Sequence, residues 1–325
     1  MIERWVRFWD QREAPQSLAL VRILVGSVLL GDLLWALVWQ VVPLVWGPPP
    51  FAAGLGYEAV PPALVIRVFG PSLHAAWAAY GLAVVACVLF VGGVAYRVTS
   101  WLLVFAMVEL WALQPIGDSI DSLLRIVLPV LAVSGAGSAW SFDAWLTRRR
   151  GRAVSETVPA WPRYLIVLQV LWLYISAGHQ RDPRTWGPPR FSAIGNVLGD
   201  PHFARFTPGS LAVFYPLQRA GTLATMVFEL SAPLYLLWLW FARNPQRGGR
   251  FGAWARRARL RWIWLIMGIF LHSGIALSMK IGLFPFGILA LYAAFLHPGE
   301  LAAGLAWLKS LAARFRTTLP GVAAP

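Results

Sequence analysis

Cysteine and charged side chains are scarce in this sequence of 325 residues, which has one cysteine, Cys87, and 13% charged residues. A single cysteine excludes a disulfide framework within the chain, and its place in an apolar run favours a small buried packing residue. Hydrophobic residues make up 58% of the chain. That is more apolar surface than a soluble protein of this length can bury, so the sequence predicts a membrane protein.

Lysine is also rare, because only 2 of the 28 basic residues are lysine, while the formal net charge is +14. Such a charge indicates nucleic-acid binding only when the basic residues gather on a soluble surface. Here they lie between hydrophobic runs, where Lys and Arg orient membrane helices, so we expect membrane lipid and no nucleic acid as a partner. The excess of Arg, Ala, Gly and Pro is typical of a GC-rich bacterium, which makes a bacterial inner membrane the expected location.

Eight apolar segments each approach the length of about 20 residues that a helix needs to cross the hydrocarbon core. The third and fourth are short, and Gln114–Asp118 between them predicts a tight helical hairpin. We expect an all-α integral membrane protein, a bundle of about eight transmembrane helices over residues 1–298 followed by a basic cytoplasmic tail at 299–325. The segments are Leu18–Val45, His74–Val94, Ser100–Gln114, Ile120–Gly135, Pro162–Ala177, Gly221–Phe241, Trp262–Met279 and Leu283–Leu296.

Basic side chains divide unevenly between the two sides of this bundle. The side of both termini receives 19 of them and the other side 7, while Arg22 and Arg125 fall inside segments. Because cytoplasmic loops carry the excess of Lys and Arg, both termini are predicted to be cytoplasmic. Arg22 lies near one end of its segment, where it can either snorkel to the membrane surface or find a buried partner.

Ionisable residues within the segments are the candidates for a functional site, because each costs at least about 2.5 kcal/mol at membrane depth. Asp121 and Arg125 lie one helical turn apart, so an ion pair between them is the simplest structural explanation. Glu229 and His272 each lie about 12 Å inward from the outer end of a segment. One cavity open to the outside would explain these depths, although ion pairs between helices would place the residues similarly. The set comprises Asp32, Glu109, Asp118, Asp121, Arg125, Glu229 and His272.

The outer loop of residues 178–220 is rich in polar and aromatic side chains, and loops of this length are often lids or binding elements. Its His179 and His202 lack the i, i+4 spacing of a helical metal pair, so we expect no metal. The chain also lacks a phosphate-binding loop, a dinucleotide-binding glycine motif and a hydrolase serine motif. These absences disfavour hydrolases and nucleotide-driven enzymes.

Short motifs in a fixed order resemble the horizontally transferred transmembrane (HTTM) domain family, which is vitamin K-dependent gamma-glutamyl carboxylase-like. The resemblance extends over approximately Arg4 to Pro298. It is carried by Leu20–Leu24 with Asp32, Tyr96–Arg97, Trp140–Asp143, Gln169 through Gly178, Trp186, His272–Gly274 and Ile281–Phe284.

This resemblance implies a membrane enzyme that oxygenates a reduced quinone of the vitamin K or menaquinone type and uses the resulting base to deprotonate a glutamate side chain, to which carbon dioxide then adds. It also implies a catalytic lysine three residues after Gly178. Arg181 stands there instead, and a guanidinium cannot serve as a general base. Arg181 is therefore expected to hold an anion, while His272 or Lys280 transfers the proton.

The other site residues follow from the same resemblance and from the intramembrane charges. Trp186, Trp172 and His179 are candidate contacts of the quinone, since aromatic side chains pack on ring systems. Asp121 and Glu229 are expected to orient the reacting groups. These residues would form a site facing the periplasm or the exterior.

Three functions remain open from the sequence. The first is a carboxylase-like or epoxidase-like membrane enzyme that acts on a reduced quinone and a peptide or small acidic substrate. The second is a non-catalytic membrane protein that binds or matures a secreted peptide. This function stays open because the chain has an arginine at the position of the family's catalytic lysine. The third is a proton-coupled transporter that uses the intramembrane acids.

Overall fold

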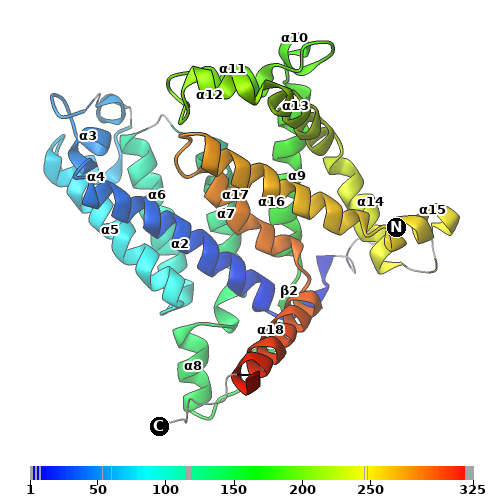
Figure 1. Ribbon diagram of the computed structural model, residues 1–325. Coiled ribbons are helices and arrows are strands. Elements are labelled where there is room, and N and C mark those ends of the chain that lie inside the picture. Colours follow the sequence, from blue (N-terminus) through cyan, green and yellow to red (C-terminus); the bar gives the residue numbers. More distant parts are fainter. Residues whose placement is uncertain are drawn as a thin grey trace. The chain divides into compact units, whose positions relative to one another are not determined.

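The chain is almost entirely helical in a computed structural model, which describes residues 3, 6, 9–52, 54–59, 61–114, 117, 119–244, 246 and 248–318. Figure 1 shows the helices in chain order. They divide into two units. The first unit comprises Met1–Ile116, Arg125–Leu165 and Ala293–Pro325, and the second comprises Gly117–Leu124 and Ile166–Tyr292.

The first unit is built on three long apolar helices, α2, α5 and α6, of which α5 packs against both of the others (Figure 1). Shorter elements connect and cover them. The elements are β1 (Arg12–Glu13), α2 (Gln16–Val38), α3 (Val42–Trp46), η1 (Leu55–Glu58), α4 (Leu64–Phe69), α5 (Leu73–Gly92), α6 (Tyr96–Leu113), most of α7 (Ser119–Val133), η2 (Ala136–Ser138), α8 (Phe142–Arg149), β2 (Val158–Pro159), most of η3 (Tyr292–Phe295) and α18 (Pro298–Thr318).

The second unit contains the outer loop of the sequence together with the helices that flank it. The loop is helical over much of its length, in three short helices. The elements are most of α9 (Trp161–His179), α10 (Pro183–Trp186), α11 (Ala193–Gly199), α12 (Pro208–Val213), α13 (Tyr215–Leu230), α14 (Ala232–Arg243), α15 (Gly249–Arg257), α16 (Leu260–Ser278) and α17 (Phe284–Leu291).

All eight predicted apolar segments are helical, and their length and composition identify the protein as an integral membrane protein. Within the described residues, four helices are individually long and apolar enough to cross a membrane: α2, α5, α6 and α16. The number rises to six if two bent helix pairs each form one span. The total of eight spans and the cytoplasmic side of the termini therefore stay predictions.

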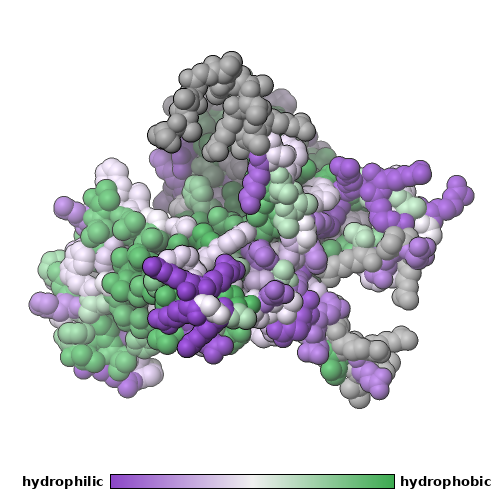
Figure 2. All heavy atoms as spheres, turned by 90° about the horizontal axis from the view of Figure 1, so that it is seen from below, coloured by the Kyte–Doolittle hydropathy of each residue, from purple (hydrophilic) through white to green (hydrophobic). Residues whose placement is uncertain are grey.

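The membrane helices expose apolar side chains over much of their surface, as expected when lipid is the solvent. Val38 on α2 is 76% exposed, and Phe270 and Leu277 on α16 are similarly open. Figure 2 shows broad hydrophobic areas on the face seen from below, next to areas of strongly hydrophilic side chains.

Two of the predicted segments are interrupted where the backbone chemistry disfavours a continuous helix. The segment Leu18–Val45 breaks after Val38, because Gln40 adopts a positive φ of 54° and Pro43 then begins a new short helix. The segment Gly221–Phe241 bends by 58° between α13 and α14, at Ser231. The hairpin predicted at Gln114–Asp118 lies partly outside the described residues.

The prediction of an all-α fold is confirmed, and the first unit adds a small antiparallel ribbon, in which Arg12 pairs with Pro159 and Glu13 with Val158. Side chains reinforce the ribbon, because the Arg12 guanidinium donates to the side-chain and backbone oxygens of Thr157 at 3.1 and 2.9 Å. These pairs satisfy backbone groups in segments that lie outside the long helices. Sequence patterns of two residues are too short to reveal such a ribbon.

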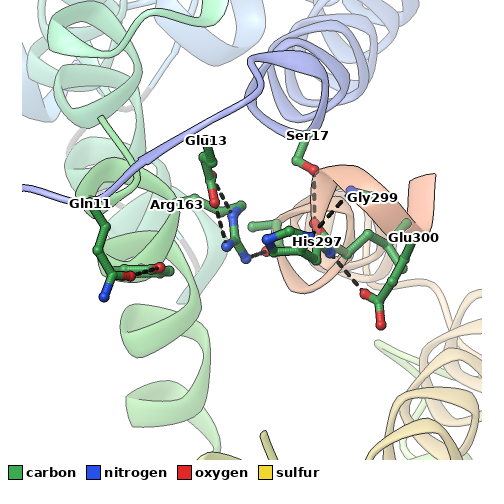
Figure 3. Close-up of polar contacts among 10 residues, drawn as sticks. Gln11, Glu13, Ser17, Arg163, His297, Gly299 and Glu300 are labelled. Atoms are coloured by element: carbon green, nitrogen blue, oxygen red, sulfur yellow. Dashed lines mark hydrogen bonds and ion pairs between the residues drawn. The ribbon is translucent and has the colours of Figure 1, made fainter. Parts of the chain in front are cut away.

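The ribbon positions a buried ion pair between Glu13 and Arg163, which Figure 3 shows pointing toward each other. Arg163 Nε and Nη2 donate to the two carboxylate oxygens of Glu13 at 2.6 and 2.7 Å, and Nη1 donates to the Ala294 carbonyl oxygen at 3.0 Å. Both side chains are at most 5% exposed. Beside them His297 Nδ1 accepts the Gly299 N–H at the start of α18, so this histidine caps the beginning of that helix.

Motif residues from the first half of the chain meet at a second junction in the first unit. Arg22 is fully buried, and its guanidinium donates to the carbonyl oxygens of Ala136, Ala139 and Trp140. The Asp143 carboxylate accepts the N–H groups of Ala95 and Tyr96, at 2.8 and 2.7 Å, and so caps the start of α6. Arg22 therefore takes buried partners instead of snorkelling, and these motifs serve the fold.

Candidate functional site

The second unit brings together three of the predicted site residues, Arg181, Trp186 and Glu229, around one ion pair. Arg181 lies in the turn between α9 and α10, and Glu229 lies in the last turn of α13. Arg181 Nε donates to Glu229 Oε2 at 2.9 Å, and Nη2 donates to Oε1. This bidentate geometry is the strong form of a charge-assisted hydrogen bond. Glu229 is thus a direct hydrogen-bond partner of Arg181.

Local sequence explains how Arg181 reaches this carboxylate. Gly178 lies in the last turn of α9, and a Cβ atom there would lie 3.1 Å from a Leu230 methyl group and 3.3 Å from Glu229 Cβ. The missing side chain therefore permits the close approach of α9 to α13. Immediately after Arg181, the Asp182 carboxylate accepts the Arg184 N–H and caps α10. The turn that carries Arg181 is fixed on both sides.

Trp186, in the last turn of α10, provides an aromatic surface for the same guanidinium. The Arg181 Cζ atom lies 4.0 Å from the centre of the Trp186 ring, within the range of a cation–π interaction. The Arg181 side chain is 31% exposed, whereas that of Glu229 is 6% exposed. Glu229 accepts from the side-on edge of the guanidinium, which carries Nε and Nη2. The end-on edge, which carries Nη1, is therefore left for other acceptors.

His272 on α16 belongs to a buried hydrogen-bonded group with two tyrosines that the sequence analysis did not single out as site residues. The Tyr174 hydroxyl lies 2.7 Å from His272 Nε2 and 2.7 Å from the Tyr292 hydroxyl. All three side chains are buried. Tyr174 lies within one of the family-like motifs, Gln169 through Gly178, whereas only the fold reveals Tyr292.

The second ring nitrogen of His272 is the unusual feature of this group. Nδ1 is buried, and among the described residues no hydrogen-bond partner lies within reach. If Nε2 accepts a hydrogen bond from Tyr174, Nδ1 carries the proton of the neutral ring. If Nε2 donates to Tyr174, Nδ1 carries a lone pair. A buried polar atom without a partner costs about 1–3 kcal/mol. Such an atom is commonly explained by a catalytic role or an absent ligand.

Aromatic side chains enclose the histidine–tyrosine group. Phe228 and Trp264 stack with ring centres 4.5 Å apart, and the Tyr174 ring lies edge-on to Phe228 at 4.8 Å. At Gly268, a Cβ atom would lie 2.0 Å from the Tyr292 hydroxyl oxygen, so only glycine lets that hydroxyl approach α16. The result is an apolar surrounding in which hydrogen bonds are stronger than in water.

The ion pair and the buried group adjoin along α13, because the ring of Phe228, which directly precedes Glu229, lies edge-on to the Tyr174 ring at 4.8 Å. The connected residues run from Trp186 and Arg181 through Glu229 to Tyr174 and His272. They come from α9, α10, α13 and α16. Four predicted site residues thus belong to one connected set: Arg181, Trp186, Glu229 and His272.

Four other predicted residues of the second unit lie outside this set. Lys280 is exposed, and its backbone N–H donates to the Phe203 carbonyl oxygen, which attaches the outer loop to the turn after α16. His179 is exposed at the end of α9, with Nδ1 2.8 Å from the Ile175 carbonyl oxygen. Trp172 is 66% exposed. Asp121 lies in the first turn of α7, partly exposed.

The remaining ionisable candidates that the structure describes belong to the first unit. Glu109 is buried on α6 and accepts the Val65 N–H at 2.8 Å. The Arg125 guanidinium lies 5.1 Å from the centre of the Trp111 ring. Asp32 is exposed on α2, and Asp118 lies outside the described residues. The contacts of Glu109 and Arg125 are structural, so these residues do not support the predicted common cavity.

No group of three His, Cys, Asp or Glu side chains within the described ranges is placed to hold a metal ion. A contact of another kind lies in the outer loop, where the His202 backbone N–H donates to Asp200 Oδ1 at 2.9 Å and the His202 ring Nδ1 lies 3.0 Å from the same oxygen. These hydrogen bonds hold the pKa of the Asp200 carboxyl below its usual value. Both side chains are largely exposed. This pair is a local loop contact.

Comparison with known proteins gives one match. A family model described as the HTTM domain matches residues 11–240. The match contains Arg181, Trp186 and Glu229, whereas His272, Lys280 and Tyr292 lie beyond its end. No curated protein and no solved structure matches the chain.

Proposed function

This chain belongs to the HTTM domain family, and from that premise we propose that it is a membrane enzyme acting on a reduced, lipid-soluble quinone and a peptide or small acidic substrate. The connected set around Arg181 and His272 would be its active site. The proposal places this site at the periplasmic or outer face of a bacterial inner membrane. The quinone would be of the vitamin K or menaquinone type and the activity carboxylase-like or epoxidase-like.

The observation that carries the proposal is the partly exposed Arg181 guanidinium, held by buried Glu229 and the Trp186 ring. An arginine remains protonated in any protein setting, so Arg181 binds charge and does not remove protons. Glu229 and Trp186 fix its orientation before a ligand arrives. The end-on edge can then hold a carboxylate or a quinone oxygen without displacing Glu229.

His272 is the better of the two predicted proton-transfer groups. Its Nδ1 is buried without a partner among the described residues, whereas Lys280 is exposed and attached to the outer loop through its backbone. A quinone oxygen or hydroquinone hydroxyl has the chemistry to satisfy Nδ1 as acceptor or donor, so these residues fit the group. A bound reduced quinone would supply the electrons for reaction with oxygen. His272 would hold or accept a proton at Nδ1, with Tyr174 and Tyr292 fixing the ring.

Turnover by the full chain in native-lipid nanodiscs tests this function. The assay supplies menaquinol, oxygen, carbonate and a glutamate-containing peptide, and mass spectrometry detects carboxylated peptide and oxidised quinone. Arg181→Ala and His272→Ala are each expected to lower turnover by about 100-fold or more, as loss of a preorganised active-site group does. Arg184→Ala and His202→Ala are matched controls, since both alter exposed pairs in the same loop. Full turnover by Arg181→Ala would disprove the proposed site.

A second function, binding or maturation of a secreted peptide without catalysis, is favoured by the arginine at the family's lysine position. Mass spectrometry of molecules that co-purify with the protein separates the two. A retained quinone supports the enzyme. A retained peptide without any quinone, together with no turnover by the native chain, supports the binding protein instead.

A further inference from the structure

A cavity in the first unit, remote in sequence from Arg181 and His272, has the properties of a ligand site. Its volume is about 370 Å³, within the range of small-molecule sites. The walls come from the start of α2, the end of η2, the last turn of α8 and the segment that follows α8. The polar residues among its lining are Gln16, Ser138, Arg148, Arg152, Ser155 and Glu156.

The cavity is lined by two arginines from a strongly basic stretch. Residues 148–152 read Arg-Arg-Arg-Gly-Arg, and Arg148 and Arg152 are the two that line the cavity. Among the described residues neither guanidinium has a carboxylate partner within 4.0 Å. Arg149 is placed differently, with its guanidinium 5.2 Å from the centre of the Trp145 ring. Two arginines at one cavity present the donor pattern that binds phosphate or carboxylate oxygens.

The start of α2 adds to this positive potential. Pro15 precedes the first helical residue and offers no side-chain acceptor to the free N–H groups, and the first turn contains no acidic residue. A helix of 23 residues therefore directs an uncompensated positive end toward the cavity.

Gln16 supplies an independent sign of a missing ligand. Its Oε1 atom is buried, and no described residue donates a hydrogen bond to it. Together with the Glu156 carboxylate in the lining, it gives the cavity hydrogen-bond acceptors beside the arginines. A ligand that combines an anionic group with a hydroxyl group would pair the first with the arginines and the second with these acceptors.

The cavity walls are held in place by the fold itself. Buried Arg22 fixes the turn that contains Ser138 and Ala139, through the carbonyl oxygens of Ala136, Ala139 and Trp140. On the other side, the Ser155 hydroxyl donates to the Thr157 carbonyl oxygen, and Arg12 of the β1–β2 ribbon donates to the same residue. A preformed site loses little entropy when a ligand binds.

We propose that this cavity binds the headgroup of a phosphate-bearing ligand that also carries a hydroxyl group. Arg148, Arg152 and the start of α2 hold the phosphate, while Gln16 and Glu156 accept hydrogen bonds from the hydroxyl. If α2, a candidate membrane span, crosses the bilayer, its first residues would lie at the depth of lipid headgroups. A glycerol phosphate headgroup of a membrane lipid has this chemistry, and a soluble glycerol phosphate shares it.

Binding is measured on the full chain in detergent by native mass spectrometry and fluorescence titration. The lipid probes are short-chain phosphatidylglycerol and phosphatidylcholine, and the soluble probes are glycerol 3-phosphate and inorganic phosphate. We expect phosphatidylglycerol to bind at least tenfold more tightly than phosphatidylcholine. Comparable affinity for glycerol 3-phosphate would identify a soluble ligand of the same chemistry, and much weaker affinity would identify the lipid.

The basic stretch provides a matched pair of variants. The Arg148→Gln/Arg152→Gln double variant removes the two cavity arginines, while Arg149→Gln/Arg150→Gln removes the same charge from the same stretch outside the cavity lining. The first is expected to weaken phosphatidylglycerol binding at least tenfold and the second less than threefold. Equal loss in both would show only general attraction of basic residues to an anionic surface and overturn the proposal, as would equal binding of phosphatidylcholine.

A third variant, Gln16→Leu, separates the hydroxyl contact from the charge. It is expected to reduce the preference for phosphatidylglycerol over phosphatidic acid, which lacks the glycerol hydroxyls. An unchanged preference would contradict the assigned role of Gln16. Thermal unfolding of all variants verifies that they fold, which is expected because the substituted arginine side chains are exposed.

Discussion

The pairs Glu13–Arg163 and Arg181–Glu229 have the same chemistry in different surroundings. In both, arginine Nε and Nη2 donate to the two oxygens of one glutamate. Arg163 is 3% exposed and uses Nη1 on the Ala294 carbonyl oxygen, whereas Arg181 is 31% exposed and rests on the Trp186 ring. All three guanidinium nitrogens of Arg163 donate within the fold, whereas Nη1 of Arg181 has no hydrogen-bond partner among the described residues. Burial and the third contact, not the ion pair itself, distinguish Arg163 from Arg181, the arginine that we propose binds a ligand.

The largest effect is expected from breaking the fully buried pair. Arg163→Met leaves the Glu13 carboxylate buried without its partner, which should lower the free energy of unfolding by about 3–5 kcal/mol. Thermal unfolding in detergent, followed by size-exclusion chromatography, measures the loss. The Glu13→Leu/Arg163→Met double variant should recover most of it, because no charge then remains buried. A single variant as stable as the native chain would contradict the structural role.

A smaller loss of stability is expected when the second pair is broken. Glu229→Gln removes the negative charge but keeps an acceptor, and the partly exposed Arg181 can bind water, so the unfolding free energy should fall by only about 1 kcal/mol. Turnover should fall much further, because the guanidinium is no longer fixed for its ligand. The same thermal and turnover assays measure both quantities. A loss of stability equal to that of Arg163→Met would place Arg181 among the structural arginines.

The smallest effect is expected from the exposed pair Arg184–Asp182, which lies one residue beyond Arg181. Arg184→Ala should leave thermal unfolding unchanged, because solvent screens exposed pairs. Arg184 holds the pKa of the Asp182 carboxyl below its usual value, so the variant should raise that pKa. An NMR titration of labelled aspartate measures the shift. Any contribution of this pair to the free energy of unfolding of the native chain is present at neutral pH and is lost as the pH falls through the lowered pKa of Asp182. A clear drop in the unfolding temperature of the variant at neutral pH would disprove the screening argument.

The candidate site was partly predictable because several of its residues stand out locally. Glu229 and His272 are ionisable side chains in apolar segments, and Arg181 stands at a position that the family resemblance identifies. Tyr292 gave no such signal, since a tyrosine near a membrane helix end is common. Lys280 was predicted from its residue type alone. In the fold its side chain is exposed, and its backbone N–H attaches the outer loop through the Phe203 carbonyl oxygen.

The sequence by itself determined that this protein lies in a membrane, because the transfer of an apolar helix into lipid depends on the summed hydrophobicity of consecutive residues. Only the tertiary structure decided which acidic and basic side chains form ion pairs. The carboxylate partners of Arg163 and Arg181 lie 150 and 48 residues away in the chain. Close helix approach at Gly178, a two-residue ribbon and a turn held by Arg22 bring such groups together, and none of these depends on residues that are neighbours in sequence.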